Sequence, residues 1–447
     1  MAIETIQNFY VFGLGLVILI FFIWWKKDGY LSPIMWFLIH MGLYYVFAPW
    51  VEIQFSQYKF NPLTLFVAFS TVTFTLIWFL VFSRLRFFGE IGRFAHHLAY
   101  KIETHEKIVR RRVIFISFVG VCILFSSIYF LYGSNLRGVF ANPVGYRKYM
   151  SNGIISLLYS LEVRLLYDVF FMYLAYRAHL KRKLLTFPIV IYLLFLFVLS
   201  FGFGSRGILI SVMLQLAVLY EFFYRRISFV KIALLSVLLM PLIVLYSEYR
   251  MLGLKVEDLN WIEFAKNLGT STDISWLFRL IVLRLDAMFN LDIYLKALDL
   301  GYLKIEPLVS FTNSWQQLVP RNFAPDKPYY FSSEMTRILL PDTFYDNATY
   351  DFTGMAEFIH NFSWEGIVFF SLIPATILAL LQRAYQNGDR FIVYFLIYLP
   401  FVGLPISIVN NGFLNTGNIV TILPITSIYL YFYFIIFSRH RKMVIRP

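Results

Sequence analysis

Long apolar runs recur from one end of the chain to the other, and they limit its possible folds more than any other feature. The first, "FYVFGLGLVILIFFIWW", approaches the ~20 residues that a helix needs to cross a bilayer. Of the 447 residues, 59% are hydrophobic and 15% are charged, whereas soluble domains have roughly 45–50% and about 25%. The pattern therefore predicts an all-α polytopic membrane protein without a separate soluble domain.

These runs predict about eleven transmembrane helices. We place them near Asn8–Trp25, Leu31–Ala48, Pro62–Ser83, Val113–Tyr132, Tyr159–Leu180, Leu184–Ser200, Ile208–Tyr224, Ile232–Ser247, Gly366–Leu381, Phe391–Val409 and Ile419–Phe437. The connection from Glu248 to Glu365 is too long for a bare loop, so it is expected to carry helices of its own. The chain then divides into a transmembrane bundle over 1–247, a loop region with the site motifs over 248–365, and further transmembrane helices over 366–447.

The Lys/Arg clusters give this topology an orientation. They occur in "WWKKDG", in the segment Arg84–Arg112, and in "YRAHLKRK", "FYRRIS", "LLQRAYQNGDR" and "SRHRKMVIRP". With about eleven spans, all of them fall on one side, which the positive-inside rule makes cytoplasmic. We therefore expect the N-terminus outside, the C-terminus in the cytoplasm and the long connection outside. The net charge of +13 then reflects topology and contact with anionic lipid, and nucleic-acid binding is not expected.

The long connection contains the amphipathic stretch "DISWLFRLIVLRLDAMFNLDIYLKALDL". The residues expected to face the membrane are Leu280, Ile281, Leu283, Leu285 and Phe289. The residues expected to be polar are Arg279, Arg284 and Asp286. Such a pattern is typical of an interfacial helix. We expect this segment to lie on the outer leaflet or to re-enter it.

Basic residues are unexpectedly frequent on the segments assigned to the outside, against the usual charge bias. Three glycines flank one of them in "FGFGSRG", where a tight turn leads into a helix N-terminus, a good setting for phosphate. A set of this size favours a bound anion such as the pyrophosphate of a polyprenol carrier. The candidate pyrophosphate-binding residues are Arg164, Arg206, Arg279, Arg284, Arg321 and Lys327. Two alternatives stay open: Arg206 snorkels to the interface, and Arg164 pairs with Asp168 one turn along its helix.

The candidates for acid–base chemistry follow at the end of the connection. Glu357 and His360 are three residues apart and so share one face of a helix just before the next span. Histidine titrates near neutral pH, and desolvation raises the proton affinity of a carboxylate. Either residue is a candidate general base. Equally open are a salt bridge from Glu357 to an arginine and a helix-end hydrogen bond for His360.

Aromatic residues beside the basic ones are candidates for glycan binding. They are Trp315, Tyr329 and Tyr330, and their rings suit stacking on sugars as well as they suit a lid on the headgroups. The single cysteine, Cys122, lies within an apolar run, and Cys/His metal motifs are absent from the sequence. No metal or other cofactor is expected.

Three motifs in this order resemble the Wzy-type oligosaccharide repeat-unit polymerases of bacterial O-antigen, capsule and exopolysaccharide synthesis. They are "GSRG" between consecutive spans, "VPRNFAPDKP" in the large outer loop, and "GMAEFIHNFSWEGIVFF" at its end. The last is similar to the family's acid-containing segment, although Ser363 to Glu365 stand where glycine is commoner. The resemblance covers topology and loop order along nearly the whole chain.

The resemblance implies a fold related to the C-type glycosyltransferases and an active site facing the periplasm from the bacterial inner membrane. It implies a metal-independent transferase that moves a growing glycan from undecaprenyl pyrophosphate to the non-reducing end of a lipid-linked repeat unit. Implied partners are the lipid-linked donor and acceptor, membrane lipid, a chain-length regulator and a flippase. Two rival functions remain: an O-antigen ligase with the same donor and a lipid A-core acceptor, and a flippase or transporter of lipid-linked oligosaccharides.

Overall fold

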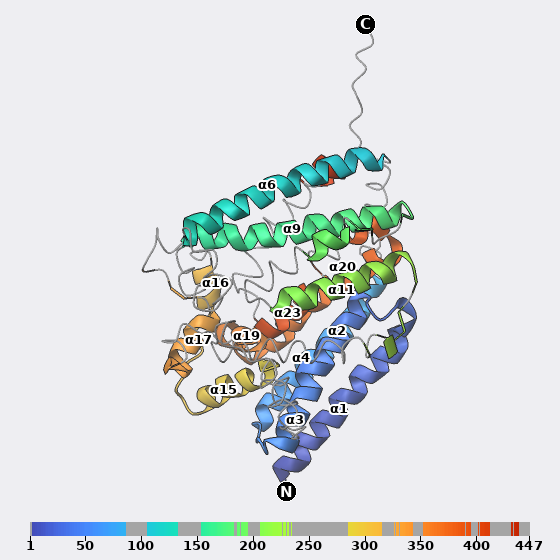
Figure 1. Ribbon diagram of the computed structural model, residues 1–447. Coiled ribbons are helices and arrows are strands. Elements are labelled where there is room, and N and C mark those ends of the chain that lie inside the picture. The colour runs from blue at the N-terminus through green and yellow to red at the C-terminus, as the bar shows by residue number, and fades with distance from the viewer. Residues whose placement is uncertain are drawn as a thin grey trace, which may run out of the picture. The chain divides into compact units, whose positions relative to one another are not determined.

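A computed structural model describes residues 2–85, 105–132, 153–182, 186–187, 189–194, 206–225, 227–228, 230–231, 234, 285–314, 326, 328–329, 331–342, 352–388, 390–394, 401, 403–411, 431 and 433–437. In these residues all regular secondary structure is helical, as the sequence predicts (Figure 1). The chain forms two compact units. Unit 1 comprises 1–96, 273–389 and 396–428, and unit 2 comprises 97–272, 390–395 and 429–447.

The N-terminal part of unit 1 consists of long apolar helices. They are α1 (Ala2–Trp25), α2 (Pro33–Gly42), α3 (Ala48–Phe55) and α4 (Pro62–Arg84), with the 3₁₀ turn η1 (Lys26–Asp28) after α1. Proline occupies the first turn of α2 and of α4, where its missing N–H costs no helical hydrogen bond. Asn61 caps α4, since its side chain accepts a hydrogen bond from the Leu63 N–H.

A π-helical segment, η2 (Leu43–Phe47), joins α2 to α3. Its cause lies in Pro49, which has no N–H to donate to the carbonyl of Tyr45 four residues earlier. The Tyr10 hydroxyl of α1 donates to that carbonyl instead, at 2.7 Å. This hydrogen bond thus connects α1 to the π-helical segment η2.

The core of unit 1 lies where α4 packs on α20 (Gly366–Asn387). Both helices bury small residues, which allow helix backbones to approach closely. On α4 the buried positions Thr64, Ala68, Thr71 and Thr75 repeat at helical spacing, and on α20 so do Ser371, Ala375 and Ala379. At one end of α20, Gln382 and Gln386 both donate to the Asp28 carboxylate at 2.7 Å, which fixes α20 to the turn after α1.

Shorter helices complete unit 1 beside this bundle (Figure 1). They are α15 (Ala287–Asp299), α16 (Val309–Ser314), α17 (Phe331–Leu339), α19 (Gly354–Phe362), η5 (Ser363–Glu365) and α23 (Leu404–Asn411). The apolar residues Leu291, Tyr294 and Leu295 of α15 are buried, and α15 contacts α4, α17 and α19. One face of α15 is thus packed on protein, whereas Phe289, which was expected to face the membrane, is exposed. The position of this helix relative to the outer leaflet stays a prediction, and the rest of the amphipathic stretch lies outside the described residues.

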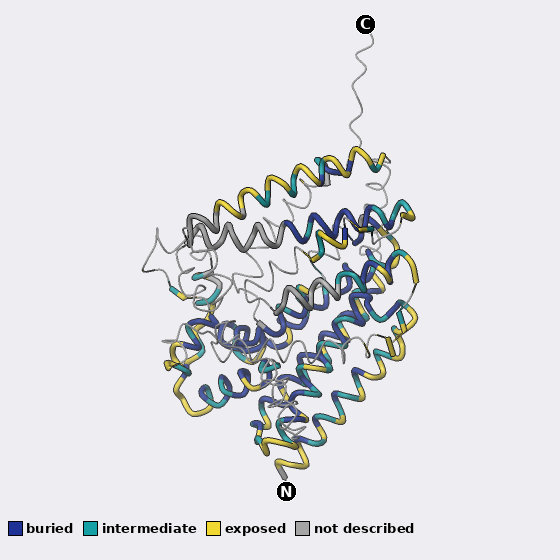
Figure 2. Tube along the Cα trace, in the orientation of Figure 1, coloured by how far each residue is buried: buried dark blue, intermediate teal, exposed yellow. Residues whose placement is uncertain are grey.

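Unit 2 is built on α6 (Glu106–Tyr132), α9 (Gly153–His179) and α11 (Arg206–Phe223), with α21 (Arg390–Ile392) and the π-helical η7 (Tyr433–Phe437). Glu106 at the start of α6 forms an ion pair with Arg177 at the end of α9, at 3.2 Å. Figure 2 shows a row of exposed residues along α6, whereas the C-terminal half of α9 is largely buried. Phe115 and Phe118 of α6 are among the exposed apolar residues. Such an exposed apolar row is suited to lipid.

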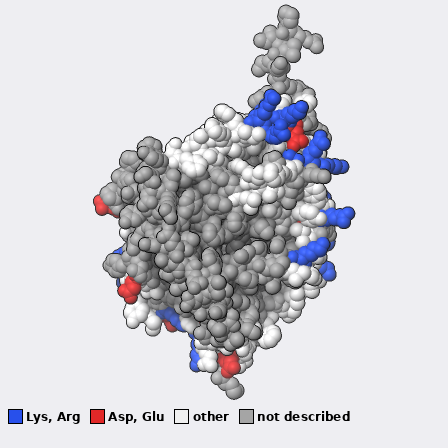
Figure 3. All heavy atoms as spheres, in the orientation of Figure 1, with Lys and Arg blue, Asp and Glu red and all other residues white. Residues whose placement is uncertain are grey.

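Four helical segments among the described residues are long and apolar enough to cross a membrane: Ile3–Asp28, Pro33–Phe55, Pro62–Arg84 and Gly354–Asn387. They contain or overlap four predicted spans and indicate a membrane protein. The part of the surface that Figure 3 shows for described residues is mostly uncharged, with charged groups at its margins. Predicted spans 113–132, 159–180 and 208–224 fall on α6, α9 and α11, or within a residue or two of their ends. The others lie wholly or partly outside the described residues, and the count of eleven, the orientation and the three-part division stay predictions.

Candidate functional site

Glu357 and His360 both lie on α19, as their spacing predicts, and both are almost fully buried, with exposed fractions of 1% and 5%. Thr353 caps this helix, and its hydroxyl accepts a hydrogen bond from the Ala356 N–H at 3.3 Å. The helix ends at Ser363, whose φ of +59° breaks the helical backbone. The two side chains are therefore carried by a short, well-defined helix that directly precedes α20.

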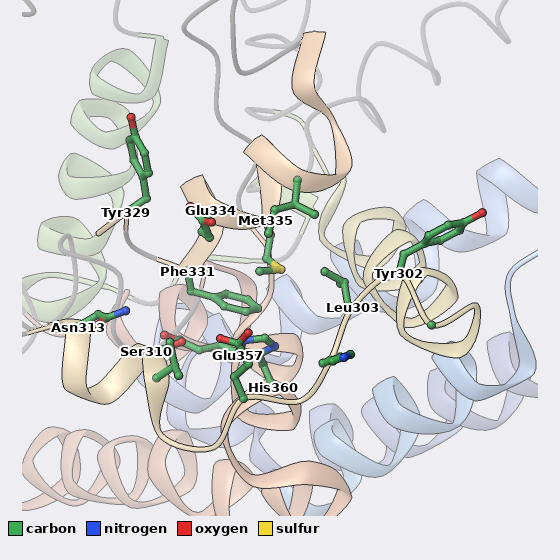
Figure 4. Close-up of a pocket in the computed structure, with 15 residues that line it drawn as sticks. Tyr302, Leu303, Ser310, Asn313, Tyr329, Phe331, Glu334, Met335, Glu357 and His360 are labelled. Carbon is green, nitrogen blue, oxygen red and sulfur yellow. The ribbon is translucent and has the colours of Figure 1, made fainter. Parts of the chain in front are cut away.

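Glu357 and His360 both line a cavity of about 330 Å³. Figure 4 shows Glu357 and His360 side by side, with the ring of Phe331 from α17 next to them. The other walls come from the loop after α15, from α16 and from the rest of α17: Gly301, Tyr302, Leu303, Lys304, Glu306, Val309, Ser310, Asn313, Tyr329, Glu334, Met335 and Ile338. All the described residues that line the cavity belong to unit 1.

His360 is oriented from two directions. The Tyr294 hydroxyl of α15 lies 3.2 Å from its Nδ1, and the Phe331 ring lies 5.4 Å from the imidazole, centroid to centroid. Burial raises the pKa of Tyr294 well above its usual value, so the phenol keeps its proton at neutral pH. Tyr294 therefore holds the Nδ1 side of the ring as a neutral hydroxyl, whichever nitrogen carries the imidazole proton.

Asn361 connects α19 to the cavity wall. Its Nδ2 donates to the carbonyl of Glu357 at 2.6 Å, and its Oδ1 accepts from the Ser310 N–H at 3.0 Å. The loop is also held through the backbone, since the Glu306 N–H donates to the His360 carbonyl at 3.1 Å. Sequence analysis did not single out Asn361, although it follows His360 directly in the third motif.

Asp292 is a second residue that sequence analysis missed. Its fully buried carboxylate accepts hydrogen bonds from the Tyr58 and Thr64 hydroxyls at 2.8 and 2.7 Å and from the Asn61 N–H at 2.8 Å, and it pairs with Lys296 at 2.6 Å. These bonds fix α15 against the start of α4, and Tyr294 lies two residues further along α15. The signal in the sequence was the i, i+4 spacing of Asp292 and Lys296, which indicates a helical ion pair but not its other partners.

Two glycines let α19 pack closely. A side-chain carbon at Gly354 would overlap the Ile408 carbonyl oxygen of α23 and would come within 2.7 Å of the Phe370 ring. A carbon at Gly366 would overlap the Phe358 carbonyl oxygen. Both glycines belong to the third motif. Both are required by the close packing of α19, the helix that carries Glu357 and His360.

The remaining predicted site residues are described only in part. Tyr329 lines the cavity and is 37% exposed. Arg206 is the first residue of α11 and Arg164 lies within α9, but their side chains are outside the described set. Arg279, Arg284, Arg321, Lys327, Trp315 and Tyr330 lie outside the described residues altogether. Convergence of the basic side chains on one site stays a prediction.

The described part of the site offers a buried carboxylate and an imidazole that face one hollow. Such a pair is suited to accept a proton from a small polar ligand or to donate a proton to it. Among the described residues, no group of three or more His, Cys, Asp or Glu side chains is arranged to hold a metal ion. Comparison of the chain with protein-family models, with curated proteins and with solved structures gave no match.

Proposed function

We propose that this protein is a polysaccharide polymerase of the inner membrane that works without a metal. It transfers a growing glycan from undecaprenyl pyrophosphate to the non-reducing end of a lipid-linked repeat unit on the periplasmic side. The observation that carries the proposal is the shared cavity of Glu357 and His360, which come from the third family-like motif. The order of the three motifs and the apolar helices support it further.

The chemistry is a displacement at the anomeric carbon of the donor sugar. The oxygen of an acceptor hydroxyl forms a bond to that carbon, while the bond from the carbon to the pyrophosphate oxygen breaks. The electron pair of the broken bond leaves with undecaprenyl pyrophosphate. The hydroxyl proton passes to the Glu357 carboxylate or to the His360 imidazole, which must lie within hydrogen-bond reach of the acceptor.

The leaving group gains negative charge in this step, and fixed cations stabilise it. Arginine suits this role because its planar guanidinium donates two parallel hydrogen bonds to phosphate oxygens. We assign the role to Arg206 with Arg164, Arg279, Arg284 and Arg321, and to Lys327. In our proposal Arg206 at the start of α11 adds its side chain to the free N–H groups of a helix N-terminus.

The test is transfer by the purified full chain in lipid vesicles, with a lipid-linked repeat unit as both donor and acceptor. Polymer should form without added metal or nucleotide sugar, and the Arg206→Ala variant should form none while keeping the melting temperature of the wild type. Normal polymer from that variant would remove the pyrophosphate role. Addition of a lipid A-core acceptor separates the rivals: transfer to it alone indicates a ligase, and movement of the lipid-linked substrate across the bilayer without transfer indicates a flippase.

A further inference from the structure

We infer that Tyr294 fixes the tautomer of His360, so that the imidazole carries its proton on Nε2 and donates a hydrogen bond into the cavity. Tyr294 is then a positioning residue, and His360 is a hydrogen-bond donor to an oxygen of the acceptor sugar. The place of the proton follows from the contacts around the ring. The identity of the ligand rests on the proposed function.

The two nitrogens of the His360 ring have different surroundings. Nδ1 lies 3.2 Å from the hydroxyl of Tyr294, a fully buried residue of α15. His360 itself lines the cavity, whereas Tyr294 is not among the described residues that line it. Each ring nitrogen offers one position for a hydrogen bond, as a donor or as an acceptor. Because Tyr294 occupies the position at Nδ1, a ligand in the cavity meets Nε2.

The hydrogen bond between Tyr294 and His360 has a preferred direction. A phenol, with a usual pKa of about 10, is a better donor than the N–H of a neutral imidazole, and the bare imidazole nitrogen, whose protonated form has a usual pKa of about 6.5, is a better acceptor than a phenol oxygen. Burial raises the pKa of Tyr294 further, so the phenol keeps the proton that it donates. Tyr294 therefore donates to Nδ1, and the hydrogen of the neutral imidazole is on Nε2.

Aromatic packing and the anchoring of α15 keep the two partners in place. The centroid of the imidazole lies 5.4 Å from that of the Phe331 ring and 6.2 Å from that of the Tyr294 ring, and these two rings pack edge to face at 5.9 Å. Asp292, two residues before Tyr294, fixes α15 to the start of α4 through its hydrogen bonds. A flip of the imidazole would place a carbon beside the hydroxyl and lose the bond at Nδ1, so the contact selects the ring orientation as well as the tautomer.

This tautomer separates the roles of the two candidate bases. An imidazole with its hydrogen on Nε2 has no lone pair there to take a proton, and it donates to a lone pair of the sugar instead. The proton of the reacting hydroxyl then passes to the Glu357 carboxylate, while His360 keeps its own proton and orients the sugar. The opposite direction, from Nδ1–H to the phenol oxygen, would leave Nε2 bare and make His360 the base.

Solid-state nitrogen NMR of the full chain in lipid bilayers, with isotope-labelled histidine, reads the tautomer directly. At about pH 8 an imidazole with the usual pKa of about 6.5 is neutral, and the loss of one of the seven histidine signals in a His360→Gln variant identifies His360. We expect a bare Nδ1 and an N–H at Nε2, with this tautomer in about tenfold excess or more, because one hydrogen bond to a buried group favours it. Tyr294→Phe, which keeps the ring and loses the hydroxyl, should reduce the excess severalfold, and Tyr220→Phe at an exposed site should leave it unchanged.

Polymer formation gives a second readout. The amide of a His360→Gln variant donates a hydrogen bond but takes up no proton at neutral pH, so this variant should form polymer at least tenfold faster than His360→Ala. A bare Nε2 or a doubly protonated ring in the wild type, an unchanged tautomer in Tyr294→Phe, or equal rates for the two His360 variants would each overturn the inference. The NMR measurement contains no lipid-linked substrate. Polymer from a protein with a bare Nε2 would therefore refute only this inference, and the expected tautomer without polymer would refute only the proposed function.

Discussion

At the scale of single residues, the buried phenols of unit 1 make an alkaline prediction. Burial, with the nearby Asp292 carboxylate as the next cause, raises the pKa of Tyr58 well above its usual value, and burial does the same for Tyr294. A raised pKa means that the folded protein holds these protons more tightly than the unfolded chain does. The stability they contribute is complete below the unfolded pKa of about 10 and is lost as the pH rises beyond it.

Melting temperatures of the detergent-solubilised protein between pH 8 and 11.5 measure this effect. We expect little change up to about pH 9.5 and a steady fall above pH 10. The Tyr58→Phe/Tyr294→Phe variant starts from a lower melting temperature, because it loses hydrogen bonds to Asp292 and His360, but its fall should be shallower. A Tyr220→Phe variant at an exposed site serves as the control. Equal alkaline slopes for all three proteins would contradict the assignment.

Ser363 supplies a second prediction at this scale. Its φ of +59° lies in the region that favours glycine, and a residue with a side chain is strained there by about 1–3 kcal/mol. We expect Ser363→Gly to raise the free energy of unfolding by about 1 kcal/mol, since the larger backbone entropy of glycine offsets part of the gain. Thermal melting checks this against Ser56→Gly, where φ is −100° and no gain is expected. A lower melting temperature for the Ser363 variant would contradict the prediction.

At the scale of elements, the sequence predicted what depends on local pattern. The apolar runs predicted the four long segments, and the spacing of three placed Glu357 and His360 on one face of α19. Contacts between segments that are far apart in the chain could not be predicted from local pattern. Asp292 meets Tyr58 and Thr64 from more than 200 positions away, and Asn361 holds Ser310 across a loop. Such polar contacts follow from tertiary packing, for which a single sequence has no periodic signal.

The close packing of α19 at Gly354 gives a prediction at the scale of elements. In a Gly354→Ala variant the new methyl group would overlap both the Ile408 carbonyl oxygen and the Phe370 ring, so α19 must shift or tilt. Overpacking of this kind costs about 1–3 kcal/mol. We expect a melting temperature lower by several degrees and a large loss of polymer yield, because the shift displaces both candidate bases.

Gly403→Ala is the matched control for that variant, because a side-chain carbon there meets no atom within 4 Å. It should leave melting temperature and polymer yield unchanged. A Gly354 variant that behaves like the Gly403 variant would show that α19 is not held where the close approach indicates.

At the scale of the whole molecule, the cavity over Glu357 and His360 is carried by the helices of unit 1. The cavity is built by the segment 301–360 on a frame of apolar helices, and Asp292 and the α4–α20 contact stabilise that frame. In the described contacts, His360 and Glu357 are held by polar groups of α15, of α19 with its cap Thr353, and of the loop after α15. Within unit 1, the apolar helices thus support the cavity, and α16, α17, α19 and the loop after α15 contribute the described residues that line it.

The most direct measurement of the central claim is the chain-length display of polymer made by purified protein from lipid-linked repeat units. Wild type, Glu357→Gln, His360→Ala, their double variant and Glu365→Gln are compared at equal amounts of folded protein. We expect a full ladder from wild type and Glu365→Gln. The rate should be about 10²–10⁴-fold lower in the double variant and in whichever single variant removes the base. Full-length polymer from both single variants would contradict it.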